Sequence, residues 1–311
     1  MSSRRLPTVK QLTYLVALEE LRHFGHAAEQ CFISQSAFSV AIRELENLVG
    51  VQLVDRTNKS VALTAEGSLF ARRARAVVAE IEAMSDAVAN AGEPLSGRLK
   101  LGVIPTIAPF LLPALLTQLR SHYPKLQLYI REEQTATIYQ ELLAGELDLL
   151  LLALPWPLRH AQTRELFSDP FRLAYRRGTK KIDTAHYDPE TLPAGSVLLL
   201  EDGHCLRDHA LSACQIGASS AINSFKGSSL QTLVQMVDAD LGVTYLPEMA
   251  CRSNLLAATD LQTLVLDRGA SREIGLAWRS GTAREQDFDL FAQQVIEVHG
   301  QQISIDKKNR S

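Results

Sequence analysis

The fold of the N-terminal part is decided by the stretch Phe24-Gly-His-Ala-Ala-Glu-Gln-Cys-Phe-Ile-Ser-Gln-Ser-Ala-Phe-Ser-Val-Ala-Ile-Arg-Glu-Leu-Glu46. Residues 24–31 have the pattern of a short helix with two alanines on its inner face. Ser34 is a typical N-cap for a second helix that reaches Leu48, with apolar residues at helical spacing. Because only Phe32 and Ile33 connect the two, this stretch predicts a helix-turn-helix.

The flanking residues extend this motif on both sides. Residues 8–20 fit an amphipathic helix, and residues 51–56 and 60–63 alternate like the two strands of a wing. A long helix is expected over 67–91, because its apolar residues recur at spacings near three, four and seven. Such a stripe usually packs against a partner helix, so this segment is predicted to dimerise. Residues 92–97, Gly-Glu-Pro-Leu-Ser-Gly, break the helix and act as a hinge.

From residue 98 the pattern alternates between strands and helices. Strands are expected at 99–104, 126–130, 147–153, 172–175, 197–200, 242–246 and 274–278, with helices between them and a closing helix at 285–299. The fold class is therefore α/β: a winged helix-turn-helix, a long linker helix, and a two-lobed effector domain like the periplasmic binding proteins. Its ligand cleft is expected at the carboxyl ends of the strands.

This organisation gives explicit boundaries. We expect residues 1–66 to form a DNA-binding domain, 67–91 the linker helix, 92–97 the hinge and 98–311 the effector domain. Lobe I takes about 98–168 and 270–311, and lobe II about 169–269. The polar tail 306–311 is expected to fray.

Composition excludes several classes of protein. The net charge is −3, and residues 1–66 hold seven Lys/Arg against seven Asp/Glu, so charge alone does not predict nucleic-acid binding. Four cysteines without a Cys-x-x-Cys pair argue against a disulfide scaffold or a zinc site, and no metal or cofactor is expected. No stretch resembles a signal peptide or a membrane span, which predicts a cytoplasmic protein with reduced thiols and no membrane partner.

Two cysteines stand in an unusual segment, Glu201-Asp-Gly-His-Cys-Leu-Arg-Asp-His-Ala-Leu-Ser-Ala-Cys214. Cys205 has cationic neighbours and opens a predicted helix, and both features lower the pKa of a thiol. A helix between the two cysteines would separate their Cα atoms by about 13 Å, whereas a disulfide needs less than about 7 Å. Bond formation would require refolding, which is the property of a switch. Cys214 can also be read as a small buried hydrophobe, and Cys31 and Cys251 as packing.

The N-terminal pattern resembles the LysR-type transcription regulators. The residues that carry the resemblance are Phe24-Gly-His-Ala-Ala28, Ser34-Gln-Ser-Ala-Phe-Ser39, Ile42-Arg-Glu-Leu-Glu46, Gly50-Val-Gln-Leu-Val-Asp-Arg56 and Leu63-Thr-Ala-Glu-Gly67. Members commonly have Pro in place of Ser36 and Leu in place of Phe38, so the operator sequence is left open.

The C-terminal part is similar to the peroxide-sensing branch of that family. The matching segments are Ile104-Pro-Thr106, Glu133-Gln-Thr135, Leu200-Glu-Asp-Gly-His-Cys-Leu-Arg-Asp208, Cys214, Ser229-Leu-Gln-Thr-Leu-Val-Gln-Met-Val237 and Arg272-Glu-Ile-Gly-Leu276. The resemblance implies that Cys205 is the peroxidatic cysteine and Cys214 the resolving one. It further implies a peroxide pocket formed by Thr106, Thr135, His204, Arg207, Asp208 and Arg272.

The second helix of the motif is the expected recognition helix. The predicted DNA-contacting residues are Gln35, Ser36, Phe38, Ser39 and Arg43 on that helix, with Arg56 and Lys59 on the wing. A solvated helix face is the alternative. The expected partners are double-stranded promoter DNA and further copies of the chain, as a homodimer or, by resemblance, a homotetramer. RNA polymerase and a thiol reductant of glutaredoxin or thioredoxin type are expected as well.

Three functions fit these observations. The first is a transcription regulator, an activator of antioxidant genes, switched by hydrogen peroxide. The second is a LysR-type regulator whose cleft binds a metabolite, with incidental cysteines. The third is a thiol peroxidase, but this leaves the first 91 residues unexplained, so no enzymatic activity is expected.

Overall fold

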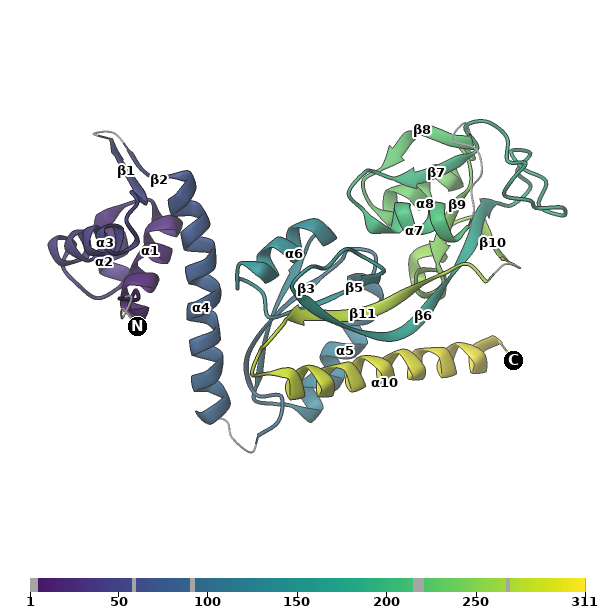
Figure 1. Cartoon of the computed structure of the whole chain (residues 1–311). Coiled ribbons are helices and arrows are strands. Elements are labelled where there is room, and N and C mark those ends of the chain that lie inside the picture. Colours follow the sequence, from purple (N-terminus) through teal and green to yellow (C-terminus); the bar gives the residue numbers. More distant parts are fainter. Residues whose placement is uncertain (1–4, 58–59, 90–92, 215–220, 267–268, 311) are drawn as a thin grey trace. The chain divides into compact units, whose positions relative to one another are not determined.

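The computed structural model describes residues 5–57, 60–89, 93–214, 221–266 and 269–310. The chain divides into two compact units, one made chiefly of residues 1–91 and a larger one made of most residues from 92 onward. Figure 1 labels most elements of each unit. No helix in the described part of the chain has the length and hydropathy needed to cross a membrane.

The N-terminal unit contains the expected winged helix-turn-helix. Its helices are α1 (Val9–Leu21), α2 (Phe24–Gln30) and α3 (Gln35–Val49), and its wing is β1 (Val54–Thr57) paired antiparallel with β2 (Ser60–Leu63). The Ser34 hydroxyl accepts the N–H of Ala37 at 3.2 Å, so Ser34 is the N-cap of α3 as predicted. Gly50 ends α3 with φ of 78°, a conformation that suits glycine.

Glu46 has a structural role on helix α3. Its Oε1 accepts the backbone N–H groups of Leu53 and Val54 at 2.9 and 3.0 Å. The carboxylate therefore fixes the start of the wing on α3.

The linker helix α4 (Ala65–Ala89) leaves apolar side chains in solvent. Leu69, Val77, Met84 and Val88 are between 48% and 79% exposed. A row of exposed apolar residues on a long helix is the surface that a partner helix would cover.

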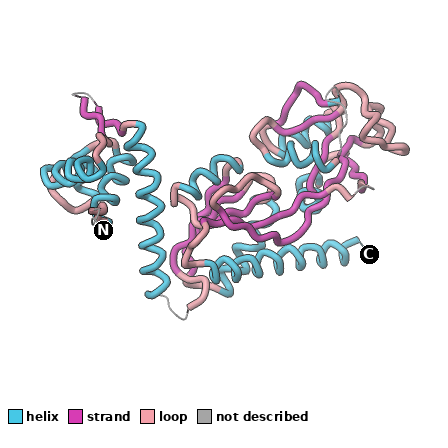
Figure 2. The backbone as a smooth tube through the Cα atoms, in the orientation of Figure 1, coloured by secondary structure: helices cyan, strands magenta, loops and turns pink. Residues whose placement is uncertain are grey.

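The larger unit is built on a mixed sheet. Strands β3 (Gly97–Val103), β4 (Leu126–Glu132) and β5 (Leu149–Leu154) are parallel and are joined through α5 (Ala108–His122) and α6 (Thr135–Leu143). Two long antiparallel strands, β6 (Ala161–Arg176) and β11 (Ser271–Arg279), extend this sheet and connect the two lobes (Figure 2). These crossing strands carry the residues of the site described below.

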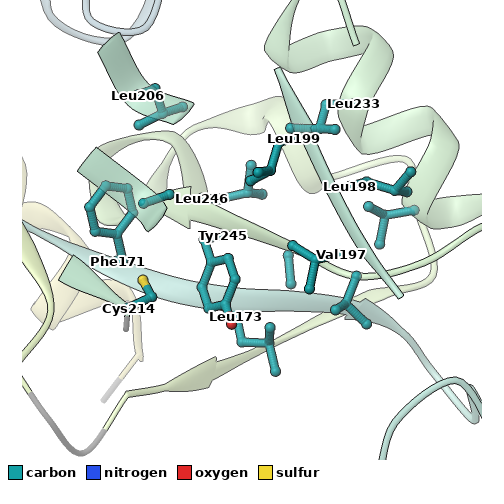
Figure 3. Close-up of a cluster of buried hydrophobic side chains, with 14 of the residues drawn as sticks. Phe171, Leu173, Val197, Leu198, Leu199, Leu206, Cys214, Leu233, Tyr245 and Leu246 are labelled. Atoms are coloured by element: carbon teal, nitrogen blue, oxygen red, sulfur yellow. The ribbon is translucent and has the colours of Figure 1, made fainter. Parts of the chain in front are cut away.

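The second lobe packs around its own apolar core. It contains β7 (Val197–Leu200), β8 (Ile222–Gly227), β9 (Thr244–Pro247), β10 (Leu261–Val265), α7 (Cys205–Ala213), α8 (Leu230–Asp238), α9 (Glu248–Arg252) and a 3-10 turn at Asn254–Leu256. Buried leucines of β7, Tyr245 of β9 and the residues Leu206 and Cys214 meet in this core (Figure 3).

The structure adds to and corrects the expected elements. Strands β8 and β10 were not predicted, and β6 begins well before the predicted 172–175. The closing helix α10 (Glu285–Arg310) is longer than the predicted 285–299 and extends into the tail that was expected to fray, of which Ser311 lies outside the described residues. The α/β class, the winged helix-turn-helix and the two lobes are confirmed.

We predict that Glu46→Ala loosens the wing. Two backbone donors lose a charged acceptor, which should lower the local opening free energy by about 1–3 kcal/mol. Hydrogen exchange of the Leu53 and Val54 amides should accelerate accordingly. Glu44→Ala removes an exposed carboxylate from the same helix and should leave this exchange unchanged; equal protection in both variants would contradict the role given to Glu46.

Candidate functional site

Two buried threonines lie where parallel strands end. Thr106 follows β3 and is 3% exposed, and Thr135 begins α6 after β4 and is 1% exposed. Both are therefore at the carboxyl edge of the sheet, where the sequence predicts the cleft.

A buried ion pair joins the two crossing strands. Arg272 of β11 stands directly opposite Asp169 of β6 in the strand register, and both side chains are almost fully buried. The Nε and Nη2 atoms of Arg272 donate to Asp169 Oδ2 at 3.1 and 3.0 Å. The other carboxylate oxygen, Oδ1, accepts the backbone N–H of Met249 at 3.0 Å. Asp169 thus fixes Arg272 and the start of α9 together.

The same arginine reaches the end of β3. Its Nη1 donates to the Thr106 hydroxyl at 2.8 Å and its Nη2 to the Thr106 carbonyl at 3.0 Å. Sequence reasoning found Arg272 and Thr106 but missed Asp169. No local signal identifies Asp169, because its role depends on the register of two strands that are far apart in the sequence.

Cys205 is the first residue of α7 and is 3% exposed. Burial raises the pKa of its thiol above the ordinary value; polar contact with Thr135 and the charge of Arg272 lower the pKa in part, and Asp208 raises it. The Thr135 hydroxyl has no partner with full hydrogen-bond geometry among the described residues, so we treat its approach to the sulfur as a polar contact.

The expected low pKa of Cys205 is therefore wrong for this form of the protein. Burial outweighs the favourable groups because a thiolate loses more hydration than they replace. The cation that acts on the sulfur is Arg272, which is distant in sequence, and not the adjacent Arg207 that the sequence suggested.

The other three predicted pocket residues differ in their surroundings. His204 is 9% exposed and occupies the N-cap position of α7, without a side-chain capping bond. Arg207 forms an ion pair with Asp202 at 3.2 Å, and Asp202 also pairs with Lys226. Asp208 is exposed. Thr106, Thr135 and Arg272 are thus brought together near Cys205, while Arg207 ties the start of α7 to the preceding loop.

Gly203 allows this loop to approach the sheet. Its φ is +99°, and a Cβ atom there would lie 2.5 Å from Gln134 Oε1, beside Thr135. Any other residue at this position would adopt an unfavourable positive φ and would also place its Cβ too close to Gln134.

Cys214 lies at the other end of α7, as its C-cap. It is 5% exposed and belongs to the core of the second lobe, beside Tyr245 and Phe171 (Figure 3). Burial raises the pKa of this thiol to about 12. All four cysteines are free thiols.

The helix between the two cysteines keeps them apart. A nine-residue helix places their Cα atoms about 13 Å from each other and turns their side chains to opposite faces. Leu206 and Ala210 are buried in the same core as Cys214, so they anchor α7 in place. The geometric obstacle expected from the sequence is present in the structure.

The predicted DNA surface is described only in part. Gln35, Ser36 and Arg43 are exposed on α3 and Ser39 is half-buried. The side chain of Arg56 and the whole of Lys59 fall outside what the structure describes. Phe38 was predicted wrongly: it is fully buried, with its ring 5.3 Å from Tyr14 and 5.9 Å from Phe24. Its apolar ring anchors α3 in the core and cannot reach a base.

A winged helix-turn-helix joined to a two-lobed α/β unit with a buried, polar-lined cysteine defines a ligand- or redox-responsive DNA-binding regulator. Residues 9–68 match the bacterial regulatory helix-turn-helix protein model of the lysR family, and residues 92–300 match the LysR substrate binding domain. The chain belongs to the LysR family of transcription regulators. No group of residues suited to a metal ion occurs in the described part of the chain.

Individual relatives extend over nearly the whole chain. The HTH-type transcriptional regulator EstR of Acinetobacter baylyi is 41% identical over 92% of this chain and 95% of its own. The hydrogen peroxide-inducible genes activator of Dickeya chrysanthemi is 33% identical over 95% and 98%. The structure of a full-length OxyR point variant from Pseudomonas aeruginosa matches with a TM-score of 0.77, at 33% identity, over 94% and 95% of the two chains.

We predict that the reactivity of Cys205 follows a raised pKa. Its alkylation by iodoacetamide, followed by mass spectrometry, should increase about tenfold per pH unit from pH 7 to pH 9, because only the thiolate reacts. Thr135→Val should move this profile to higher pH, since the polar contact with the sulfur is lost. Thr137→Val, at an exposed position of α6, should not. A plateau below pH 8 in the native chain would contradict the raised pKa.

We also predict that Asp169→Asn destabilises the larger unit by about 3–5 kcal/mol, because Arg272 is left as a buried, uncompensated charge. Urea unfolding followed by the fluorescence of Trp156 and Trp278 measures this change. Asp202→Asn breaks ion pairs of an exposed carboxylate and should have little effect. Similar midpoints for the two variants would exclude a structural role for the buried pair.

Proposed function

We propose that the chain is a DNA-binding transcription regulator that senses hydrogen peroxide through Cys205. The observation that carries this proposal is the buried thiol beside Thr135 and Arg272, with Thr106 held by the same guanidinium. A relative that shares nearly the full length is named for hydrogen peroxide.

The residues of the site suit a reaction with peroxide. The Cys205 thiolate attacks one oxygen, so that an S–O bond forms, the O–O bond breaks and Cys205 becomes a sulfenic acid. The departing hydroxide takes a proton and leaves as water. Arg272 stabilises the thiolate, and threonine hydroxyls can donate to and accept from the peroxide. Cys214 then gives up its proton and attacks the Cys205 sulfur as a thiolate, so that the S–S bond forms and the S–O bond breaks. The departing hydroxide takes up that proton and leaves as a second water.

Disulfide formation would change the second lobe. Since α7 separates the two cysteines, the helix must unwind and withdraw Leu206 and Ala210 from the core. Such a local event can select a different arrangement of the lobes and of the contacts between copies of the chain.

The remaining parts have matching roles in this proposal. Residues 1–66 bind promoter DNA through α3, and the exposed apolar row of α4 pairs two chains on a pseudo-palindrome. Contacts between effector domains of residues 98–311 complete a homotetramer. RNA polymerase is the partner at the activated promoter, in the cytoplasm, and a glutaredoxin or thioredoxin reduces the disulfide. In this proposal the protein reacts with peroxide in order to sense it and does not turn over peroxide as an enzyme.

A metabolite-responsive regulator is the second candidate. It is favoured by the relative EstR, whose identity of 41% exceeds that of the relative named for peroxide and whose name refers to no oxidant. In that case the two cysteines would be packing residues.

The two candidates differ in the effect of Cys205→Ser. We predict that this variant loses peroxide-dependent transcription while it binds promoter DNA with unchanged affinity, measured by a reporter gene and by electrophoretic mobility shift. Cys251→Ser, at a half-buried cysteine outside the site, is the matched control and should keep the response. A peroxide response that persists in Cys205→Ser would reject the sensor function.

The disulfide is tested separately. One equivalent of peroxide should link the peptides of Cys205 and Cys214 in the native chain, whereas Cys214→Ser should stop at the sulfenic acid. Sulfenic acid as the sole product in the native chain would remove the bridge from the mechanism.

A further inference from the structure

A small pocket lies beside the elements that hold Asp169. Its volume is about 140 Å³ and its walls include Phe110 of α5, Met249 and Arg252 of α9, and His299 and Gln302 of α10. None of these residues belongs to the peroxide site proposed above.

Both lobes contribute to the pocket. Helices α5 and α10 pack on each other in the first lobe, where Gln302 Nε2 donates to the Phe110 carbonyl at 3.1 Å. Helix α9 belongs to the second lobe, and Phe110 also packs against the core of that lobe. The shape of the pocket therefore depends on how the two lobes meet.

Two residues that line the pocket, Met249 and His299, interact with Asp169 of the buried ion pair. The backbone N–H of Met249 donates to Asp169 Oδ1, while Oδ2 of the same carboxylate holds Arg272. His299 lies within electrostatic reach of Asp169, and its ring stacks on Phe167 of β6 with centroids 3.6 Å apart. Asp169 thus links this pocket to the arginine that acts on the Cys205 thiol.

The chemistry of the walls selects an anion with a short apolar end. The polar side chains are the guanidinium of Arg252, the hydroxyl of Ser253, the imidazole of His299 and the amide of Gln302, and among the described residues no acidic side chain lines the pocket. Arg252 Nη2 donates to Glu248 Oε1 at 2.9 Å, so a ligand in the pocket would bind to the other N–H groups of this guanidinium. A guanidinium matches the two oxygens of a carboxylate. Phe110, Met249 and Ile305 provide the apolar wall.

We propose that this pocket binds a small carboxylate of about four carbon atoms, and that its occupancy favours the reduced form of the Cys205–Cys214 pair. A ligand that fits the pocket formed by the reduced arrangement of the lobes stabilises that arrangement against the oxidised one. By linkage, oxidation weakens the ligand's binding to the same degree. The effect of the ligand on the Cys205–Cys214 pair rests on the proposed redox function, whereas the binding of the ligand does not.

Binding is tested on the reduced, full-length protein by calorimetric titration with sodium butyrate, with the uncharged isostere butyramide as the matched probe. We expect saturable binding of butyrate, in the millimolar range for so small a ligand, and at least tenfold weaker binding of butyramide. Arg252→Gln should weaken butyrate binding at least tenfold, and Arg120→Gln, at an exposed position of α5, should leave it unchanged.

Arg252→Gln also removes the contact of Arg252 with Glu248 and could therefore disturb folding. A second variant tests the site without this change. Ile305 is 58% exposed at the wall of the pocket, so Ile305→Trp should obstruct the pocket without removing a polar contact. Butyrate that binds Ile305→Trp as well as the native chain, or butyramide that binds as well as butyrate, would overturn the site.

The coupling is measured with glutathione redox buffers and thiol mapping of Cys205 and Cys214. At a butyrate concentration ten times its dissociation constant, the equilibrium constant for disulfide formation should fall by up to about elevenfold, and Ile305→Trp should show no such shift. Binding without a shift would overturn the coupling. If no disulfide formed in any buffer, the proposed redox function would be rejected. The carboxylate site would still be supported by the calorimetric titration.

Discussion

The buried ion pair between Arg272 and Asp169 is the interaction around which the larger unit is arranged. A charged pair away from water is tolerated only when its donors and acceptors are satisfied. Here both oxygens of Asp169 are used, and Arg272 bonds to Asp169 and Thr106 through all three guanidinium nitrogens. The pair therefore fixes β6, β11, the end of β3 and the start of α9 relative to one another, and a movement of any one of them disturbs the others.

This constraint determines the chemistry of Cys205. Burial keeps the sulfur as a thiol, and Arg272 with Thr135 offsets part of that effect. An arginine held in place by a carboxylate has a defined position toward the sulfur, which favours the thiolate without exposing it to solvent. A protein that must remain reduced until an oxidant enters its pocket benefits from this balance between burial and charge.

Helix α7 supplies the second constraint. Its apolar side chains anchor it in the core of the second lobe, and this anchoring holds the two thiols on opposite faces. Since the same helix carries Cys205 toward Arg272, one element links the chemistry of the thiol to the packing of a whole lobe. The pocket at Met249 and His299 is connected to the ion pair through the Met249 N–H, so both features meet at Asp169.

The sequence by itself determined the local elements and the residues that carry chemistry. Caps such as Ser34 and the helical spacing of apolar residues act over a few positions, and they indicated the helix-turn-helix and α7 correctly. The partner of Arg272, the burial that raises the pKa of Cys205 and the burial of Phe38 were decided only by the tertiary structure. Each depends on strand register or on packing between segments far apart in the chain, because desolvation and ion pairing arise from neighbours in space and not in sequence.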